Sequence, residues 1–398
     1  MEIRPILSTL MRNRIGAILI ALQIALTMAV IINSVFIILD RAETMRRPIG
    51  VDSESLIVAR SADVADDRTD ESVVRADIER LTALDGVLGA TKMSTMPLSN
   101  SGSNSGYRTS LDDDATSTSM AYYSVGFNAL EVLGLELSAG RWFEESEVVF
   151  DPPDGFNSPV VVVSDAMAKE FFPESDPIGK FIYTGTGAAI EVIGVVKMMS
   201  RPWYGWGNFY TTGMFPMVDR NSLTVVRVDP DRREQLIEPV AESLRESSLD
   251  RLVDTPRTHD EIIARTYQRD VAMNRMLKVV MSLVVLITML GIVGIASFSV
   301  AQRRKQIGTR RAIGAQKFHI VRYFLVENWL ITTGGVVLGL LLSFLINNLL
   351  VTEYGMPKLD PVYLPVVILG LWAVGLIATL GPARNAMNVD PAIATRNI

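Results

Sequence analysis

The sequence predicts a membrane protein with four transmembrane α-helices, one before and three after a large α+β ectodomain. Four apolar segments reach the length of about 20 residues that a bilayer-spanning helix needs: residues 15–39, 279–300, 320–351 and 362–380. More than 200 mostly polar residues separate the first two segments, enough for a folded domain. The mean hydropathy of +0.26 with 21% charged residues suits neither an ordinary soluble enzyme nor a pure helix bundle.

Charge is divided unevenly along the chain, and this division predicts the topology. Residues 40–270 carry 23 basic and 39 acidic side chains, whereas the remaining segments carry 15 and 5. Residues 301–317 hold six Lys or Arg and no acid between two apolar segments. Short loops rich in Lys and Arg stay on the cytoplasmic side of a membrane. We therefore expect this bend and both termini in the cytoplasm and the ectodomain outside.

The N-terminal region predicts a membrane anchor. Residues 15–39 exceed the apolar core of a signal peptide and no small-x-small cleavage site follows, so we interpret them as uncleaved. Residues 1–14 place Ile3, Leu7 and Leu10 on one helical face, which favours an interfacial amphipathic helix over a disordered tail. The chain has no Cys, so the ectodomain must be stabilised by its own core without disulfides.

The ectodomain, residues 40–257, shows two strand–helix–strand patterns, at about residues 55–95 and 222–255. We expect these two ends to form one α+β subdomain, with about residues 96–221 inserted as a second. The aromatic segment, residues 201–210 (RPWYGWGNFY), places five aromatic residues around two glycines. It predicts either a ligand platform or, as we favour, a glycine-hinged hairpin whose rings pack into a local core or against a partner.

A long helix is expected to return the chain to the membrane. Thr258 and Glu261 have the spacing of a capping box, and no proline interrupts the following residues. We therefore expect one stalk and membrane helix over residues 258–300, followed by the cytoplasmic bend at 301–319. The remaining elements are expected to be spanning helices at residues 320–351 and 362–381, an outer loop at 352–361 and a cytoplasmic tail at 382–398.

Small residues four apart mark candidate helix–helix contacts within the membrane, because they let helices approach closely. They are Ala17, Ala21, Ala25 and Ala29 in the first spanning segment and Gly335 and Gly339 in the third. The alanine stripe predicts packing between helices, including packing between two protomers, unless it only reflects the abundance of Ala in such helices. Glu327 is the one acid within a predicted span. We interpret it as a hinge or packing residue bonded to a polar neighbour such as Tyr323 or to a facing helix, rather than a proton relay.

The sequence predicts no catalytic, cofactor-binding or metal-binding residues. The patterns G-x-x-x-x-G-K-[ST], H-E-x-x-H and G-x-S-x-G are all absent. His259 and His319 fall on opposite sides of the membrane in the predicted topology, and we interpret both as solvated. We therefore expect no enzyme activity from this chain and no nucleic-acid partner.

Residues 303–331 (RRKQIGTRRAIGAQKFHIVRYFLVENWLI) resemble the signature of the MacB/FtsX-like permease family of ABC transporters: a basic bend, two glycine-marked turns and a Glu in the third helix. The segment 382–386 followed by Asp390, Pro391 and Ala392 is similar to that family's closing motif. Four further segments resemble the MacB-type periplasmic core domain, namely residues 139–143, 160–172, 176–180 and 192–196. The aromatic segment departs from the family pattern.

The resemblance implies a multi-pass permease subunit of the inner membrane with a periplasmic ectodomain. A separate cytoplasmic ATPase dimer would bind ATP and Mg²⁺ and dock on a coupling helix at residues 307–318. The implied coupling residues are the apolar anchors Ile307, Ile313 and Phe318, the polar rim Arg310, Arg311 and Lys317, and Gly314. Motion transmitted through the helices would then drive efflux.

Other implied partners are a second permease copy or a related permease, a periplasmic adaptor and the lipid bilayer. Two alternatives share this architecture. One is an FtsX-like regulatory subunit that activates a periplasmic hydrolase, and the other is a permease that extracts lipoproteins from the membrane.

Overall fold

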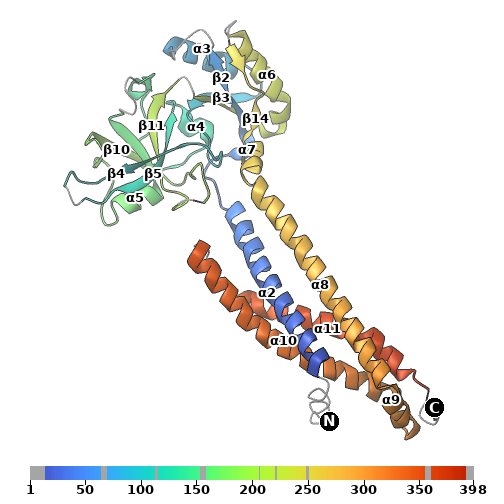
Figure 1. Cartoon of the computed structure of the whole chain (residues 1–398). Helices are drawn as coiled ribbons and strands as arrows, with labels where there is room; N and C mark the ends of the chain where they lie inside the picture. Colours follow the sequence, from blue (N-terminus) through green and yellow to red (C-terminus); the bar gives the residue numbers. More distant parts are fainter. Residues whose placement is uncertain are drawn as a thin grey trace. The chain divides into compact units, whose positions relative to one another are not determined.

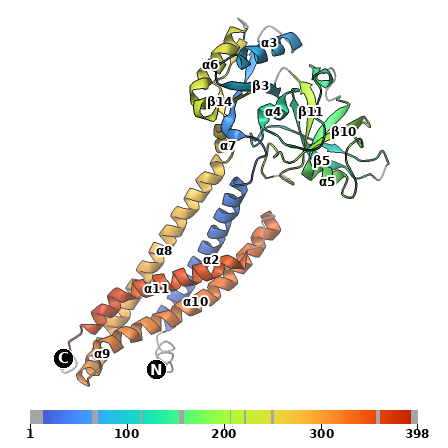
Figure 2. The ribbon, with the colours of Figure 1, turned by 180° about the vertical axis from the view of Figure 1, so that it is seen from behind.

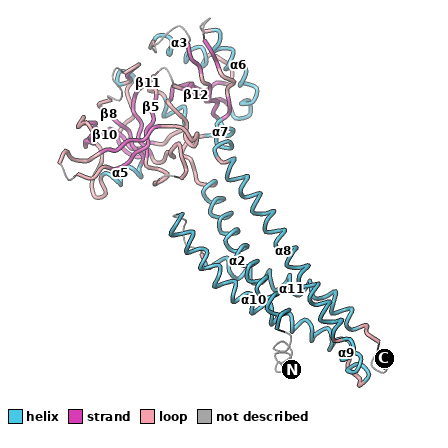
Figure 3. Tube along the Cα trace, in the orientation of Figure 1, coloured by secondary structure: helices cyan, strands magenta, loops and turns pink. Residues whose placement is uncertain are grey.

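The computed structural model of the chain consists of two compact units (Figure 1). One unit comprises Met1–Met45 and Asp270–Ile398, and the other comprises Arg46–Arg269. The first is built from helices and the second around a β-sheet, as Figure 3 shows by colour. The structure describes residues 14–63, 70–112, 115–152, 158–205, 207–219, 222–247, 251–354 and 360–390. The predicted interfacial helix lies outside these residues except for Arg14.

Four helices of the first unit are long and apolar enough to cross a membrane. They are α2 (Arg14–Met45), α8 (Gln268–Gln302), α10 (Lys317–Tyr354) and α11 (Leu364–Met387), which follows the 3-10 turn η4 (Pro361–Tyr363). Helix α10 packs against both α2 and α11 (Figure 2). Their shared apolar core includes Ile24 and Met28 of α2, Val336 of α10 and Leu371 of α11. The predicted arrangement of one plus three membrane helices is confirmed.

Helix α8 is the least covered of the four. It contacts α2 through polar side chains: the Oγ1 atoms of Thr27 and Thr288 lie 2.6 Å apart, and Arg41 forms an ion pair with the buried Asp270. Most of its apolar side chains, such as Leu290, remain exposed within the chain. In a membrane such a face contacts lipid or another protein.

Helix α11 extends beyond the predicted end at residue 381, because it continues through Pro382 to Met387. A proline inside a helix removes one backbone hydrogen bond. Tertiary packing offsets that loss here, since Ala383 and Ala386 are buried in a cluster with Ile307 of the bend and Phe324 of α10.

The second unit contains a mixed sheet in the order β14-β1-β12-β3-β5-β11-β8-β10-β6. The two ends of the unit meet in it, because β12 pairs antiparallel with both β1 and β3. A separate two-stranded sheet joins β2 to β13. The elements from these ends are η1 (Ser53–Ser55), β1 (Leu56–Ala59), β2 (Ser61–Asp63), α3 (Glu71–Thr82), β3 (Val87–Met93), β12 (Leu223–Val228), η3 (Pro230–Arg232), α6 (Arg233–Glu246), β13 (Arg251–Val253), β14 (Arg257–Thr258) and α7 (His259–Thr266).

The intervening residues extend the same sheet. A single pair, Met93 with Val125, links β3 to β5 and so joins the two halves. One apolar core runs beneath both halves, with Val58 and Val225 from one and Val162 and Met214 from the other. The intervening elements are β4 (Ser103–Tyr107), β5 (Thr118–Val125), α4 (Ala129–Leu133), β6 (Leu137–Gly140), η2 (Glu145–Glu147), β7 (Val149–Phe150), β8 (Val160–Ser164), α5 (Asp165–Phe171), β9 (Phe181–Tyr183), β10 (Ala189–Val196) and β11 (Thr212–Val218).

The helix expected over residues 258–300 is divided. The capping box is present, since Thr258 Oγ1 accepts a hydrogen bond from the Glu261 amide at 3.2 Å and Glu261 Oε2 accepts one from the Thr258 amide at 3.3 Å. Helix α7 nevertheless ends at Tyr267 (φ −87°, ψ 3°), and α8 begins at the next residue. The Tyr267 side chain is buried, with its ring centroid 4.9 Å from that of Tyr204. We attribute the break to this packing, because neither Gly nor Pro occurs there.

Candidate functional site

The basic bend between α8 and α10 is a short helix followed by a glycine turn. Helix α9 (Arg304–Ala312) ends before Gly314, which has a φ of +101°. This left-handed conformation favours glycine, and the amides of Gly314 and Ala315 bond back to the carbonyls of Arg311 and Arg310 at 3.1 and 3.0 Å. The coupling helix expected at residues 307–318 is therefore wrong in its bounds. Gly314 ends α9, and Lys317 and Phe318 belong to the first turn of α10.

The predicted apolar anchors separate into one buried and two exposed residues. Ile307 is 6% exposed and packs beneath the bend against Val300, Phe324 and Ala386. Ile313 and Phe318 are 81% and 67% exposed. Ile307 therefore holds the bend to its own chain, whereas Ile313 and Phe318 are available to a partner.

The basic side chains near these residues have different surroundings. Arg310 lies over the Tyr323 ring, with its guanidinium carbon 5.4 Å from the ring centroid. Arg311 donates a hydrogen bond to the Val389 carbonyl oxygen at 2.6 Å, which ties the bend to the end of α11. Lys317 is exposed. The three cations and the two exposed apolar residues thus lie within residues 310–318 of the chain.

A buried ion pair fastens the bend to α10. Arg303 Nη1 donates to Glu327 Oε2 at 2.9 Å, and the two side chains are only 12% and 9% exposed. A cation from the bend thus occupies the place that we expected for a polar neighbour such as Tyr323. Because ionisable residues within membrane segments usually pair with one another, the sequence indicated that Glu327 has a charged partner. It did not identify Arg303 as that partner, because the two residues are 24 positions apart.

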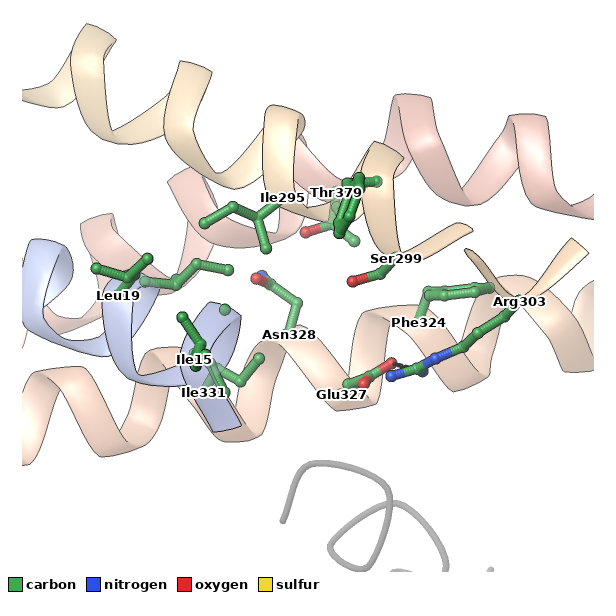
Figure 4. A pocket seen from close by; sticks show the side chains of 15 residues that line it. Ile15, Leu19, Ile295, Ser299, Arg303, Phe324, Glu327, Asn328, Ile331 and Thr379 are labelled. Carbon is green, nitrogen blue, oxygen red and sulfur yellow. Dashed lines mark hydrogen bonds and ion pairs between the residues drawn. The ribbon is translucent and has the colours of Figure 1, made fainter. Parts of the chain in front are cut away.

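A cavity of about 390 Å³ lies beside this ion pair (Figure 4). Its walls come from α2, α8, α10 and α11 and are mostly apolar, with Ile15, Leu19 and Ile331 among them. Asn328 also lines the cavity and donates to the Gly375 carbonyl oxygen at 2.9 Å, which links α10 to α11. Beside this incompletely filled space, polar contacts therefore link α10 to α11 and to Arg303 of the bend.

The small residues bring α2 and α10 into close contact. A Cβ atom on Gly335 would lie 2.8 Å from the Ala21 carbonyl oxygen, and one on Gly339 would lie 2.7 Å from Met28 Cβ. Ala25 and Ala29 are fully buried. Ala17 instead lines the cavity. The alanine stripe therefore packs within the chain, and the alternative of a contact between protomers does not fit Ala25 and Ala29.

Replacing Gly339 with Leu should destabilise the helical unit by about 1–3 kcal/mol, because overpacking a close contact forces neighbouring atoms apart. Gly334 provides a matched control in the same helix, since a Cβ atom there meets nothing within 4 Å. Thermal unfolding of both leucine variants in detergent measures the difference. Equal unfolding temperatures for the two variants would show that close packing at Gly339 is unimportant.

The two histidines have opposite surroundings. His319 is exposed on α10, as expected. The expectation of a solvated His259 is wrong, because its side chain is completely buried and Nε2 lies 2.9 Å from the Pro97 carbonyl oxygen. Burial lowers the pKa of His259 below its usual value, outweighing the opposing effects of the Pro97 carbonyl and Asp260.

The full chain should therefore lose stability as the pH falls below about 6.5, the usual pKa of unfolded His. The unfolded chain takes up a proton first, because the pKa of His259 is lower in the folded state. Denaturant unfolding between pH 7.5 and 5.5 measures this loss, and His259→Gln should reduce its slope. An unchanged slope in that variant would assign the pH dependence to other groups.

The aromatic segment does not form an open platform in its described residues. Phe209 is buried, and Tyr204 packs on Tyr267. Tyr210 donates a hydrogen bond from Oη to the Pro48 carbonyl oxygen at 3.0 Å. Burial is the main reason that the pKa of Tyr210 is raised. The favoured interpretation, rings packed into a local core, fits these contacts.

The four spanning helices, the large domain inserted after the first, and the basic bend define a membrane permease with a periplasmic-type domain. The sequence profile of the MacB-like periplasmic core domain matches residues 17–243, and that of the FtsX-like permease C-terminal domain matches residues 278–391. The chain belongs to this MacB/FtsX-like permease family of ABC transporters.

Curated relatives include the macrolide export ATP-binding/permease proteins MacB of Shewanella sp. (strain W3-18-1) and Neisseria meningitidis serogroup A. The first is 27% identical over 68% of this chain and 42% of its own length, and the second is 28% identical over 75% and 46%. The chain thus spans less than half the length of these relatives.

Solved structures with a similar fold include the periplasmic region of MacB from Actinobacillus actinomycetemcomitans, at 19% identity, a TM-score of 0.34 and coverage of 54% of this chain and 92% of that one. The extracellular domain of the transporter YknZ from Gram-positive bacteria is 18% identical, with a TM-score of 0.33 and coverage of 50% and 99%.

Proposed function

We propose that this chain is the transmembrane subunit of an ABC exporter and that a separate ATPase docks on the basic bend. The observation that carries the proposal is the exposure of Ile313 and Phe318 in a short segment that also contains Arg310, Arg311 and Lys317. Exposed apolar residues with a polar border are typical of protein-binding surfaces. The matched relatives are named as ATP-binding/permease proteins, whereas this sequence lacks the G-x-x-x-x-G-K-[ST] pattern.

The bend is suited to pass a displacement on to the helices. The Arg303–Glu327 ion pair joins it to α10, and Arg311 joins it to the end of α11. Helix α8 runs without interruption from Gln302, at the bend, to Gln268. At a rise of about 1.5 Å per residue it forms a rod of about 50 Å. ATP-driven closure of the docked ATPase would therefore move the far end of α8.

The positive bend supports a cytoplasmic location for the bend and both termini in an inner-membrane, multi-pass protein. Export of a macrolide-like compound is the form of this function that the relatives' names favour. A second permease copy and a periplasmic adaptor are the partners that we propose for it.

The absence of Cys allows a direct test of this function. Single cysteines are introduced at Thr309 in the bend and at Lys169 on α5, and intact cells are treated with a thiol reagent that does not cross the inner membrane. We expect labelling of Lys169→Cys only, and co-purification of an ATPase with the membrane-inserted chain. Labelling of Thr309→Cys from outside would refute the proposed topology and, with it, docking of a cytoplasmic ATPase on the bend.

A further inference from the structure

The aromatic segment, residues 201–210, contacts the connection that leads from α2 into the sheet-based unit. Tyr210 Oη donates to the Pro48 carbonyl oxygen at 3.0 Å. The Arg47 guanidinium lies over the Phe209 ring, 5.9 Å from its centroid. Just before the segment, the Ser200 amide donates to the Ile49 carbonyl oxygen at 2.7 Å. The incoming connection is thus held at three successive residues.

The same segment also contacts the connection that leaves the unit. Tyr204 packs against Tyr267, the residue between α7 and α8. The preceding residue is tied as well, since Thr266 Oγ1 donates to the Leu98 carbonyl oxygen at 2.5 Å. Leu98 in turn donates its amide to the Arg201 carbonyl oxygen at 3.2 Å. Incoming and outgoing connections therefore meet on one short segment.

Buried hydrogen bonds fix this segment to the sheet. Arg201 is 4% exposed and donates from Nε to the Thr211 carbonyl oxygen at 3.1 Å and from Nη2 to the Ser119 carbonyl oxygen at 2.8 Å. Ser119 belongs to β5, and Thr211 precedes β11. Gly207 has a φ of +60°, and a Cβ atom there would lie 3.0 Å from Arg201 Nη1. These contacts fix Arg201, at the start of the segment, to the sheet and leave little free space beside Gly207.

The turn at Tyr267 (φ −87°, ψ 3°), between the end of α7 and the start of α8, is the place where a displaced rod would bend. We propose that residues 201–205 and 207–210 form a rigid joint that braces this break and holds both connections to the sheet, so that movement of α8 carries the sheet with it. This inference rests on the proposed function. It makes Tyr204, Tyr210 and Tyr267 positioning residues for the transmission of motion.

The test needs no knowledge of the transported substrate. Nitroxide labels are attached at Lys169→Cys on α5 and Thr352→Cys on α10, two exposed positions in a chain without other Cys. Pulsed EPR measures the distance between them in the complex with its ATPase, without nucleotide and with ATP and vanadate. Tyr204→Ala should broaden the distance distribution and reduce the nucleotide-dependent shift at least twofold, with ATPase co-purification unchanged.

Conservative and matched variants separate the joint from general damage. Tyr204→Phe keeps the ring and should restore the shift, and Tyr210→Phe should reduce it partially because only the bond to Pro48 is lost. Phe181→Ala removes an exposed ring of β9 and should leave the shift unchanged. Hydrogen exchange of residues 46–50 and 266–269 should be equally slow with and without nucleotide.

Each outcome bears on one proposal. If Tyr204→Ala leaves both the nucleotide-dependent distance shift and the distance distribution unchanged, the joint is refuted. Faster hydrogen exchange at residues 46–50 and 266–269 in the presence of nucleotide would also refute it, because the contacts would then open. A parent chain that binds its ATPase but shows no shift would instead refute transmitted motion, and with it the proposed mechanism.

Discussion

Replacing Arg303 with Met is expected to destabilise the helical unit by about 3–5 kcal/mol, because removing one partner of a buried ion pair leaves the other charge uncompensated. Glu327 is 9% exposed, and Arg303 is its described ion-pair partner. The free energy of unfolding of the full chain in detergent measures the loss. Glu327→Leu should be similarly costly, since it leaves the Arg303 cation in the same apolar surroundings.

The double variant Arg303→Met with Glu327→Leu decides whether the two residues act as a pair. It should be more stable than either single variant, because both charges leave the buried site together. Lys197→Met serves as a control, since Lys197 and Glu136 form an ion pair in which both side chains are about 70% exposed. That variant should lose at most about 1 kcal/mol. Additive losses in the double variant would show that Arg303 and Glu327 do not stabilise the bend as a pair.

The sequence predicted the membrane architecture because hydrophobic length and charge are properties of whole segments. The predicted helix bounds were wrong where a boundary depends on the tertiary contacts of single residues. The α7–α8 break depends on the packing of Tyr267 against Tyr204, which are 63 positions apart in the chain. The extension of α11 past Pro382 depends on burial of Ala383 and Ala386. Local sequence carries no record of such distant contacts.

The predicted coupling residues show the same limit on a smaller scale. Residue types identified the bend, but a helix of nine residues has too few turns for a clear periodic signal of which side is buried. Ile307 therefore could not be separated from Ile313 by pattern alone. The partner of Glu327 was obscured for a related reason, because the turn at Gly314 and the first turns of α10 together determine which cation of the bend reaches it.

Docking of the ATPase should be the property most sensitive to change in the bend. Ile313→Asp combined with Phe318→Asp should weaken the binding of the ATPase at least about a hundredfold. Burying one large apolar side chain contributes about 1.5–3 kcal/mol, and about 2.8 kcal/mol corresponds to a hundredfold change in affinity. Both side chains are exposed in the chain alone, so folding and membrane insertion should be unaffected.

Charge reversal at Arg310 and Arg311 is a less selective test, because Arg311 also holds the end of α11 and Arg310 contacts Tyr323. Val362→Asp provides the control for the double aspartate variant. Val362 is 69% exposed but lies in η4, beyond the end of α10 that is opposite to Phe318, so ATPase binding should be unchanged. Leucine at positions 313 and 318 should retain binding by keeping the apolar surface. If the double aspartate variant still binds the ATPase as tightly as the parent chain, the docking surface lies elsewhere, even though the bend remains the most positive short segment between two membrane helices.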